Sequence, residues 1–289
     1  MKRYIDGLLA LLFVSVAFTA CTQDEGSMPG GDANPNLVIF AQKTVVPNNA
    51  DNDGTYRVAV NNKTTEVYYL AEPTKTVKSN GMSEASYADY VVSKGTKVTL
   101  ATDSLSGGSY SDVVVTGMVG DNTVSFVAVG GGQKTLRQTT FFGLVWLDVV
   151  TGTYTFNSTA QKRLGLGKTV STTLQKLESD PTQYRLKNLF GLGVHLKFTL
   201  TKNTGSDSYD SYDYVRVPGQ ELPLTYGTYG AISIRDIGYW KGDDSMAFSP
   251  DYGCYMYNNA HKYEINFGVQ LYVSAGSLGY GWDYFEPAQ

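Results

Sequence analysis

Residues 194–200 read Val-His-Leu-Lys-Phe-Thr-Leu, and the stretch alternates strictly between apolar and polar side chains. Successive side chains of an extended chain point to opposite faces. The four apolar side chains therefore share one face, whereas His195, Lys197 and Thr199 share the other. This pattern predicts an antiparallel strand with one face in a core and the other face in water.

Similar segments rich in Val, Thr, Tyr and Phe lie on both sides of this strand, between turn residues. Consecutive strands with short connections, and without a helical period between them, favour an antiparallel meander. Residues 149–289 are therefore predicted to close as a β-barrel or sandwich, with a lipocalin-like strand order. The segments are residues 152–156, 170–177, 182–187, 214–217, 230–237, 263–273 and 282–285.

Residues 37–148 show the same rhythm of short strands, with one exception. In residues 83–92, Ser83 is a suitable helix cap, and Ala85, Ala88 and Val92 recur near the helical period. We therefore expect an all-β, immunoglobulin- or fibronectin III-like sandwich with one short helix. The strand-like segments are residues 37–40, 55–60, 66–71, 96–100, 112–116 and 123–129.

Two parts of the chain resemble known proteins. Residues 67–70 (Val-Tyr-Tyr-Leu) and 113–129, with their Gly-Asp-Asn turn, resemble a fibronectin type III-like domain of Bacteroidetes lipoproteins. Residues 152–200 together with 272–282 resemble the C-terminal β domain of uncharacterised Bacteroides lipoproteins. The resemblances imply an all-β fold and a cell-envelope location. Such N-terminal modules usually bind or position a partner, and neither resemblance supplies a site residue.

The N-terminus predicts a signal peptide over residues 1–20 and a lipid anchor. Lys2 and Arg3 precede an apolar run at residues 7–18, which is too short to span a bilayer. The following Phe-Thr-Ala-Cys resembles a bacterial lipobox, in which the thiol of Cys21 takes a diacylglycerol. Several acyl chains hold a protein on a membrane more firmly than one.

The residues after the anchor predict a tether and a location. Residues 21–36 are polar and rich in Gly and Pro, as expected for a lipidated flexible linker. Thr22, rather than Asp, follows the cysteine, and this favours the outer membrane. The acidic run at residues 23–25 resembles a short signal that sends Bacteroidetes lipoproteins to the outer leaflet. We therefore expect the protein to face outward.

Composition excludes several classes of function. The 289 residues carry 23 basic and 27 acidic side chains, for a net charge of −4, and the basic residues are scattered. Binding of nucleic acid through charge is therefore not expected. Two Cys and two His without metal-ligand spacing exclude a disulfide scaffold, a zinc ribbon and a redox CxxC site, and we expect no metal or other cofactor.

Two acidic segments deserve comparison with calcium sites. Residues 49–54 (Asn-Ala-Asp-Asn-Asp-Gly) begin like a calcium loop, but Val60 stands where the bidentate Glu is needed. A polar hairpin is the expected structure there. Asp207, Asp210 and Asp213 alternate with tyrosines, and a solvated loop is the expected explanation for them, ahead of a calcium or sugar site.

Motifs of nucleophilic catalysis are absent from the sequence, which has neither a G-x-S-x-G elbow nor H-E-x-x-H. Cys254 precedes His261 by seven residues, but its aromatic surroundings indicate a small buried hydrophobe. A carboxylate pair for glycoside hydrolysis leaves no signature in a sequence. A lipid-anchored hydrolase therefore stays open as an alternative.

Aromatic residues near the C-terminus give the clearest indication of function. Tyr239 and Trp240 precede a polar segment, residues 241–245, that contains Asp243 and Asp244. Sugar C–H faces stack on aromatic rings, while sugar hydroxyls donate to carboxylates. These four residues are therefore the candidate ligand-binding site, which includes no metal and no catalytic residue.

Tyr280, Trp282 and Tyr284 share one face of the last strand, and we expect this face to pack in the core. The sequence thus predicts a non-enzymatic, outer-membrane lipoprotein that binds a glycan or a partner protein at the cell surface. The alternatives are a glycan hydrolase with a carboxylate pair near Trp240, and a structural subunit of an envelope assembly.

Overall fold

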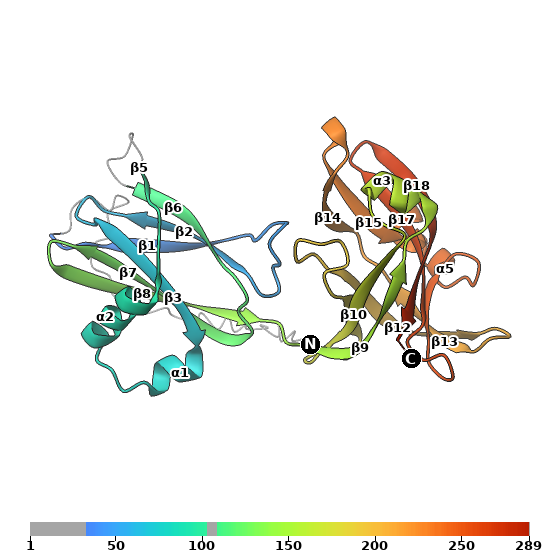
Figure 1. Cartoon of the computed structure of the whole chain (residues 1–289), viewed down its shortest axis with the longest axis horizontal. Coiled ribbons are helices and arrows are strands. Elements are labelled where there is room, and N and C mark those ends of the chain that lie inside the picture. The colour runs from blue at the N-terminus through green and yellow to red at the C-terminus, as the bar shows by residue number, and fades with distance from the viewer. Residues whose placement is uncertain (1–32, 103–108, 289) are drawn as a thin grey trace, which may run out of the picture.

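Figure 1 shows the computed structural model of the chain, in which two β-rich domains follow one another. The structure describes residues 33–102 and 109–288. The predicted signal peptide, Cys21 and most of the predicted linker lie outside the described residues. Within the described part, no helix is long and apolar enough to cross a membrane.

The N-terminal domain is a sandwich of two sheets, as predicted. The facing side chains of the sheets form a core around Tyr56, Val58 and Phe126, which are almost completely buried. Among the described residues each sheet has four strands. One has the order β1 (Leu37–Gln42), β2 (Gly54–Val60), β6 (Ser109–Val115), β5 (Ala101–Thr102), and the other the order β4 (Thr96–Lys97), β3 (Glu66–Pro73), β7 (Gly120–Gly130), β8 (Gln133–Gly143).

Two helices, rather than the one expected, cover the outer face of the second sheet. The predicted helix is confirmed as α2 (Glu84–Lys94), and the Ser83 hydroxyl accepts a hydrogen bond from the backbone N–H of Ser86. The additional helix, α1 (Thr74–Ser79), follows Pro73 without a side-chain cap. It is too short for a helical period, so the sequence gives no signal for it.

The C-terminal domain is a closed antiparallel barrel. Of the two architectures predicted for it, the barrel is therefore the one observed. Each strand pairs with the next along the chain, apart from an inserted hairpin, β14 (Gln220–Thr225) and β15 (Ala231–Asp236), and β18 closes the barrel on β9. Within residues 109–288 the barrel has eight strands: β9 (Trp146–Thr155), β10 (Thr169–Leu177), β11 (Gln183–Leu186), β12 (Leu196–Ser206), β13 (Ser211–Arg216), β16 (Cys254–Tyr257), β17 (Ile265–Val273) and β18 (Gly276–Pro287).

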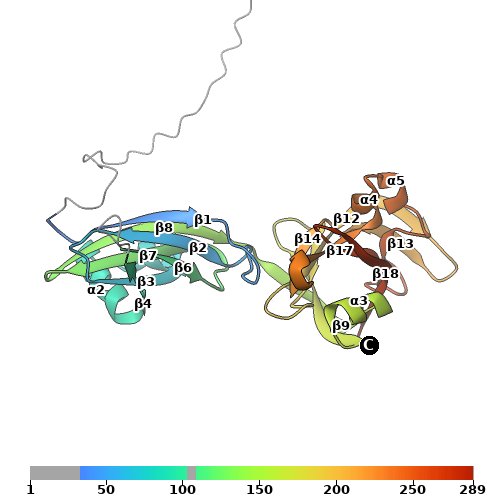
Figure 2. The ribbon, with the colours of Figure 1, turned by 90° about the horizontal axis from the view of Figure 1, so that it is seen from above.

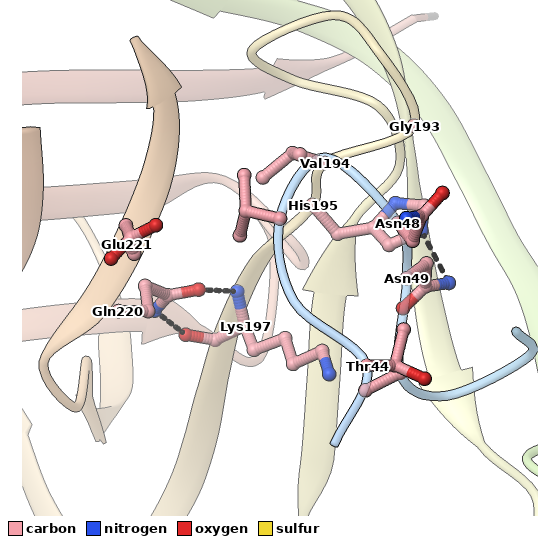
Figure 3. A pocket seen from close by; sticks show the side chains of 11 residues that line it. Thr44, Asn48, Asn49, Gly193, Val194, His195, Lys197, Gln220 and Glu221 are labelled. Atoms are coloured by element: carbon pink, nitrogen blue, oxygen red, sulfur yellow. Dashed lines mark hydrogen bonds between the residues drawn. The ribbon is translucent and has the colours of Figure 1, made fainter. Parts of the chain in front are cut away.

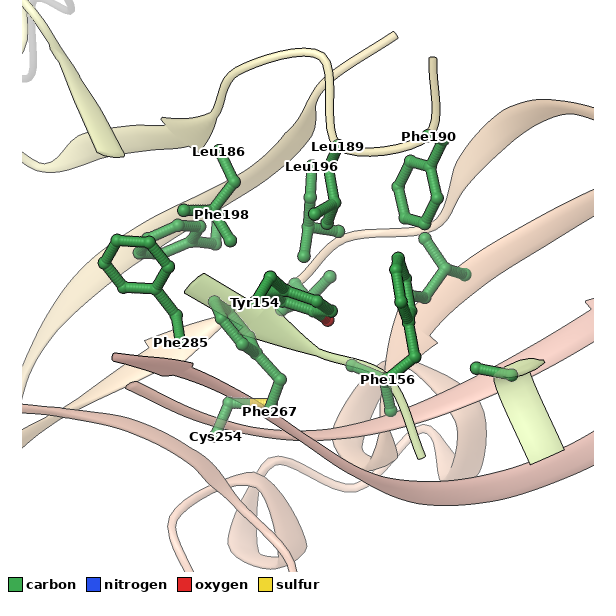
Figure 4. Close-up of a cluster of buried hydrophobic side chains, with 14 of the residues drawn as sticks. Tyr154, Phe156, Leu186, Leu189, Phe190, Leu196, Phe198, Cys254, Phe267 and Phe285 are labelled. Carbon is green, nitrogen blue, oxygen red and sulfur yellow. The ribbon is translucent and has the colours of Figure 1, made fainter. Parts of the chain in front are cut away.

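Large side chains fill the barrel (Figure 4). Tyr154, Phe198, Phe267 and Phe285 are fully buried there. Leu196 and Phe198 point inward and Lys197 points outward, so the alternation that the sequence predicted for this strand is confirmed.

Three short α-helices interrupt the strands of the C-terminal domain, where none was expected. They are α3 (Ser158–Leu164), α4 (Ile237–Lys241) and α5 (Asp244–Ala247). Ala160 and Leu164 of α3 belong to the barrel core. Figure 2 shows α3 on a different side of the barrel from α4 and α5. Helices of one or two turns leave no periodic pattern in a sequence.

The two domains have separate cores and a short connection. The hydrophobic clusters of the two domains share no residue. Strand β8 ends at Gly143 and β9 begins at Trp146, so the division at residue 148 falls inside β9. That each part folds independently remains a prediction.

Candidate functional site

Tyr239 and Trp240 lie on helix α4 rather than in the loop that the sequence suggested. The Asp236 carboxylate caps this helix by accepting the backbone N–H of Tyr239 at 2.9 Å. Gly242 ends the helix in the left-handed region, with φ of 67°. Both cap residues are visible in the sequence, but they enclose only five residues.

The two predicted acceptors, Asp243 and Asp244, already have partners within the chain. The Asp243 carboxylate caps α5, accepting from the backbone N–H (2.9 Å) and the hydroxyl (2.7 Å) of Ser245. These bonds lower the pKa of Asp243. The Asp244 carboxylate accepts from Arg216 at 2.7 Å. The structure thus gives both acids a role in holding α5.

Arg216 of β13 joins several of these residues, and the sequence analysis missed it. Its Nε donates to the buried Asp236 at 2.8 Å, while Nη1 donates to Asp244. Its guanidinium also lies 4.4 Å from the ring centroid of Tyr239. Arg216 therefore fixes α4 and α5 on the outside of the barrel.

Trp240 is half-buried and faces other side chains of the outer surface. The Lys241 ammonium lies 4.0 Å from its ring centroid, and the ring of Tyr280 is 6.1 Å away. The Trp240 indole therefore belongs to a larger group of neighbouring rings and does not stand alone as a sugar-stacking surface.

The expectation that Tyr280, Trp282 and Tyr284 pack in the core is wrong. These rings lie on the outer face of β18, and Tyr284 is 43% exposed. The alternate positions Asp283 and Phe285 point into the barrel and are 1% and 0% exposed. The Asp283 carboxylate made the inward face of the strand look polar in the sequence. The opposite, aromatic face was therefore assigned to the core.

Seven rings follow one another across the outer face of the barrel, and we call them the aromatic strip. They come from α4, β18, β16, the turn between β12 and β13, and the segment between β16 and β17. Successive ring centroids are 6.1, 6.5, 6.3, 5.5, 5.3 and 3.7 Å apart, in the order Trp240, Tyr280, Trp282, Tyr255, Tyr257, Tyr209, His261.

Gly268 on β17 creates the space in which two of these rings lie. A Cβ at Gly268 would stand 2.3 Å from the Tyr280 hydroxyl and 3.2 Å from the Trp282 ring. The Tyr280 hydroxyl donates to the carbonyl oxygen of Tyr252 at 2.8 Å, which fixes the ring. A side chain at position 268 would therefore displace the middle of the aromatic strip.

Asn266, also on β17, places an amide beside the rings. Its neighbours in register are Tyr255 on β16 and Tyr284 on β18. Because Ile265 and Phe267 point into the core, Asn266 points outward. Its side chain makes no hydrogen bond to any residue that the structure describes, so its donors and acceptor face the solvent at the strip.

The phenol groups of the aromatic strip are uncharged hydrogen-bonding groups at neutral pH. Burial raises the pKa of Tyr255, Tyr257 and Tyr280 above the ordinary value for tyrosine. The Tyr257 hydroxyl donates to Asp207 at 2.9 Å, and that of Tyr209 donates to Glu264 at 3.3 Å.

The acidic turn next to the aromatic strip is held by its own backbone. The Asp207 carboxylate accepts the N–H groups of Tyr209 and Asp210, and the Asp210 carboxylate accepts those of Ser211 and His261. Asp213 lies farther along, on β13. Over the described ranges, no group of three or more His, Cys, Asp or Glu side chains is arranged to hold a metal ion.

Cys254 and His261 do not form a catalytic pair. The Cys254 thiol lies inside the barrel, where it donates to the carbonyl oxygen of Gly268 at 3.4 Å, and burial raises its pKa. His261 lies outside, stacked on Tyr209 and 3.0 Å from Glu264.

Residues 49–54, compared above with a calcium loop, instead form part of the contact between the two domains. Asp51 is buried there and pairs with Arg185 at 3.1 Å and with Lys197 at 2.5 Å. The indole N–H of Trp146 also donates to Asp51, at 3.1 Å. We call this group the domain joint, and the sequence analysis missed it.

A groove of about 200 Å³ lies beside the domain joint (Figure 3). His195, which was expected to be a simple surface residue, lines this groove together with Asn49 and Lys197. Its Nδ1 accepts the backbone N–H of Asn188 at 2.9 Å. Burial, together with the nearby Arg185 charge, lowers the pKa of His195 to about 4. The imidazole is therefore neutral at pH 7.

No family model and no curated protein matches the chain. Among solved structures, the Kfla1895 D451A mutant aligns with a TM-score of 0.23 and 11% identity, covering 84% of this chain and 29% of that one. The same mutant in complex with cyclobis-(1->6)-alpha-nigerosyl gives 0.22 and 12%, covering 84% and 30%. The chain thus spans less than a third of the length of these proteins. Likenesses at these TM-scores assign no function to this chain.

Proposed function

We propose that the protein is a non-enzymatic lipoprotein of the outer membrane, held by an acylated Cys21, whose C-terminal barrel binds a glycan on the aromatic strip. The observation that carries this proposal is the position of Trp240, Tyr280 and Trp282, which lie on the outside of the barrel rather than in its core.

The outer side of an antiparallel barrel that faces water is ordinarily polar. Contiguous apolar surface in that position marks an interaction site. Aromatic rings pack against the C–H faces of sugars, while the Asn266 amide matches sugar hydroxyls. Trp240, Tyr280 and Trp282 supply the apolar component, and Asn266, one strand away from Trp282, supplies the polar one.

The acids near the strip favour binding over hydrolysis. Glycoside hydrolysis needs one carboxyl that stays protonated and a second carboxylate across the bond. Hydrogen bonds instead lower the pKa of Asp207 and Asp243, and Asp244 pairs with Arg216. Asp283, whose pKa burial raises to about 6, lies inside the filled barrel.

A protein partner is the second candidate, because exposed tyrosines also suit protein surfaces. Tyr239 and Tyr284 are 49% and 43% exposed and border the strip. A structural role in an envelope assembly would use such a partner. Both candidate functions use the same rings, which would bind a glycan in the first and a protein in the second.

A glycan array probed with the mature chain carrying Cys21→Ala tests the proposal. We expect binding to at least one glycan, and a loss of about two- to tenfold in affinity for Trp282→Ala, the range for one aromatic contact. The matched control is Tyr229→Ala, because Tyr229 is 55% exposed on the β14–β15 hairpin and stacks on Tyr226. No binding to any glycan, combined with capture of a protein partner that Trp282→Ala abolishes, would replace the glycan with a protein.

A further inference from the structure

Strand β8 forms an edge of the second sheet of the N-terminal domain, and in the described ranges no strand pairs with its outer side. The β7–β8 hairpin closes at the pair Gly130 and Gln133, with two residues between them and an unbroken register. Gln133 and every second residue after it therefore bond to β7, whereas the residues between them turn their backbone N–H and C=O groups away from the sheet. These outward groups run from Lys134 to Phe142, so β8 can pair with an added strand.

The residues with outward backbone groups have their side chains on the side of helix α2. Leu136 packs there with Tyr87 and Val91, and Lys134 pairs with Asp89. Figure 1 shows α2 beside β8. Opposite residues of paired strands share a face, so alternate side chains of an added strand would also lie on the side of α2.

Two adjoining hollows, of about 410 and 390 Å³, lie between β8 and the helices, and Glu84 and Leu136 line both of them. The first is also lined by Ala85, Ala88 and Lys134, and the second by Val77, Met82 and Gln138. Met82 is 43% exposed. Because methionine adapts its shape to an apolar neighbour, the second hollow suits an aliphatic side chain.

The first hollow has an uncompensated negative charge. The Lys134 charge is balanced by Asp89 at 2.6 Å, whereas Glu84 forms no ion pair within the described part of the chain. Arg137 turns to the opposite face of β8, where it donates to Asn36 at 3.3 Å. The Glu84 carboxylate therefore favours a ligand with a basic side chain at this point.

We propose that β8 binds an extended segment of a partner protein as an added antiparallel strand. An aliphatic side chain of that segment would lie in the hollow beside Met82, and the Lys or Arg side chain two residues later would lie beside Glu84. Strand addition uses the backbone for affinity and alternate side chains for specificity. This site lies on the N-terminal domain and is separate from the aromatic strip.

Two segments of this chain fit the site less well than a partner does. Residues 22–32 carry three acids, a proline and no basic residue. In β8 of a second copy, the residues on the helix side read Lys, Leu, Gln, Thr and Phe, so no aliphatic residue precedes a basic one. A partner segment can supply both side chains in the required order.

The experiment pans a phage-displayed library of random heptapeptides against the mature chain carrying Cys21→Ala, and fluorescence anisotropy measures the affinity of the enriched peptides. We expect peptides in which an aliphatic residue precedes Lys or Arg by two positions. Gln138→Pro should weaken their binding by about tenfold or more, because it removes an outward N–H and its ring obstructs the added strand. Gln138→Ala is the matched control and should change the affinity by less than about twofold.

Glu84→Lys should weaken peptide binding by about two- to tenfold, and replacing the basic residue of the peptide with Glu should restore it. This charge exchange decides the question if thermal melting shows that Gln138→Pro does not fold. Trp282→Ala should leave the peptide affinity unchanged, because Trp282 lies in the other domain.

The absence of enriched peptides, or peptides that bind every variant equally well, would overturn this inference. A dimer that Gln138→Pro dissociates would overturn it in favour of a second copy of the chain. Peptide binding that appears only after deletion of residues 22–32 would overturn it in favour of the chain's own linker.

Discussion

Replacing Asp51 with Ala should uncouple the two domains. The Asp51 carboxylate accepts hydrogen bonds from Arg185, Lys197 and Trp146, all of which belong to the C-terminal side of the chain. The side chains of Asp51 and Arg185 are only 7% and 6% exposed. Removing the carboxylate leaves the Arg185 guanidinium buried without its counter-charge.

The loss of stability in Asp51→Ala depends on the groups that still contact Arg185 in the variant. Loss of one partner of a buried ion pair costs about 3–5 kcal/mol. Arg185 keeps the Gln175 side chain, which accepts from Nε at 2.7 Å, and the Trp146 ring, 4.5 Å from its guanidinium. The pKa of Arg185 is lowered by burial to about 10, which shows that desolvation outweighs the ion pair. We therefore expect a loss near the lower limit, about 2–3 kcal/mol in the free energy of unfolding.

Urea denaturation followed by tryptophan fluorescence gives this free energy, and small-angle X-ray scattering reports the angle between the domains. Asp53→Ala is the matched control, because Asp53 lies in the same loop but accepts from Asn49 and Gly117 within the N-terminal domain. Arg185→Met in the Asp51→Ala background should recover part of the loss. Scattering and unfolding indistinguishable from wild type in Asp51→Ala would refute the role of the domain joint.

Three further predictions concern the anchor and the barrel interior. Cys21→Ala should move the protein from the membrane pellet to the supernatant, since acylation is the proposed attachment; a variant that still sediments after a high-salt wash would need another anchor. Burial raises the pKa of Asp283 to about 6, above the unfolded value of about 3.9, so its ionised form destabilises the fold above pH 6 and this penalty disappears as the pH falls toward 4. Urea denaturation at pH 7 and pH 5 compares the free energy of unfolding of the wild type with that of Asp283→Asn. The wild type should be more stable relative to the variant at pH 5 than at pH 7, and the change between pH 4 and pH 7 should be at most about 3 kcal/mol. The same difference at both pH values would contradict this. The Cys254 thiol should resist a thiol reagent in the native protein and react in urea, because it is fully buried and its pKa is raised; rapid native labelling would place it elsewhere.

The sequence was informative where one residue type settles a local structure. Alternation at residues 194–200 predicted the strand because one face of an antiparallel barrel packs inside and the other does not. Ser83 predicted the start of α2 because a hydroxyl there caps the helix. These signals lie within a few residues of the element that they describe.

The sequence failed where distant residues decide the outcome. Asp283 looks like a surface residue, but Tyr154 and Asn157 satisfy its carboxylate inside the barrel, and this turned Tyr280 and Trp282 outward. The aromatic strip unites residues from Tyr209 to Trp282 through strand register, which no local pattern contains. The partners of Asp51 are likewise more than 90 residues away from it.

Tryptophan fluorescence during titration with the best glycan from the array tests the central claim most directly. Of the three tryptophans, Trp240 and Trp282 lie in the aromatic strip, whereas Trp146 lies at the domain joint. We predict that Trp146→Phe keeps the full fluorescence change and that the double variant Trp240→Phe, Trp282→Phe loses it. A change that persists in the double variant and disappears in Trp146→Phe would place the ligand at the domain joint and contradict the account.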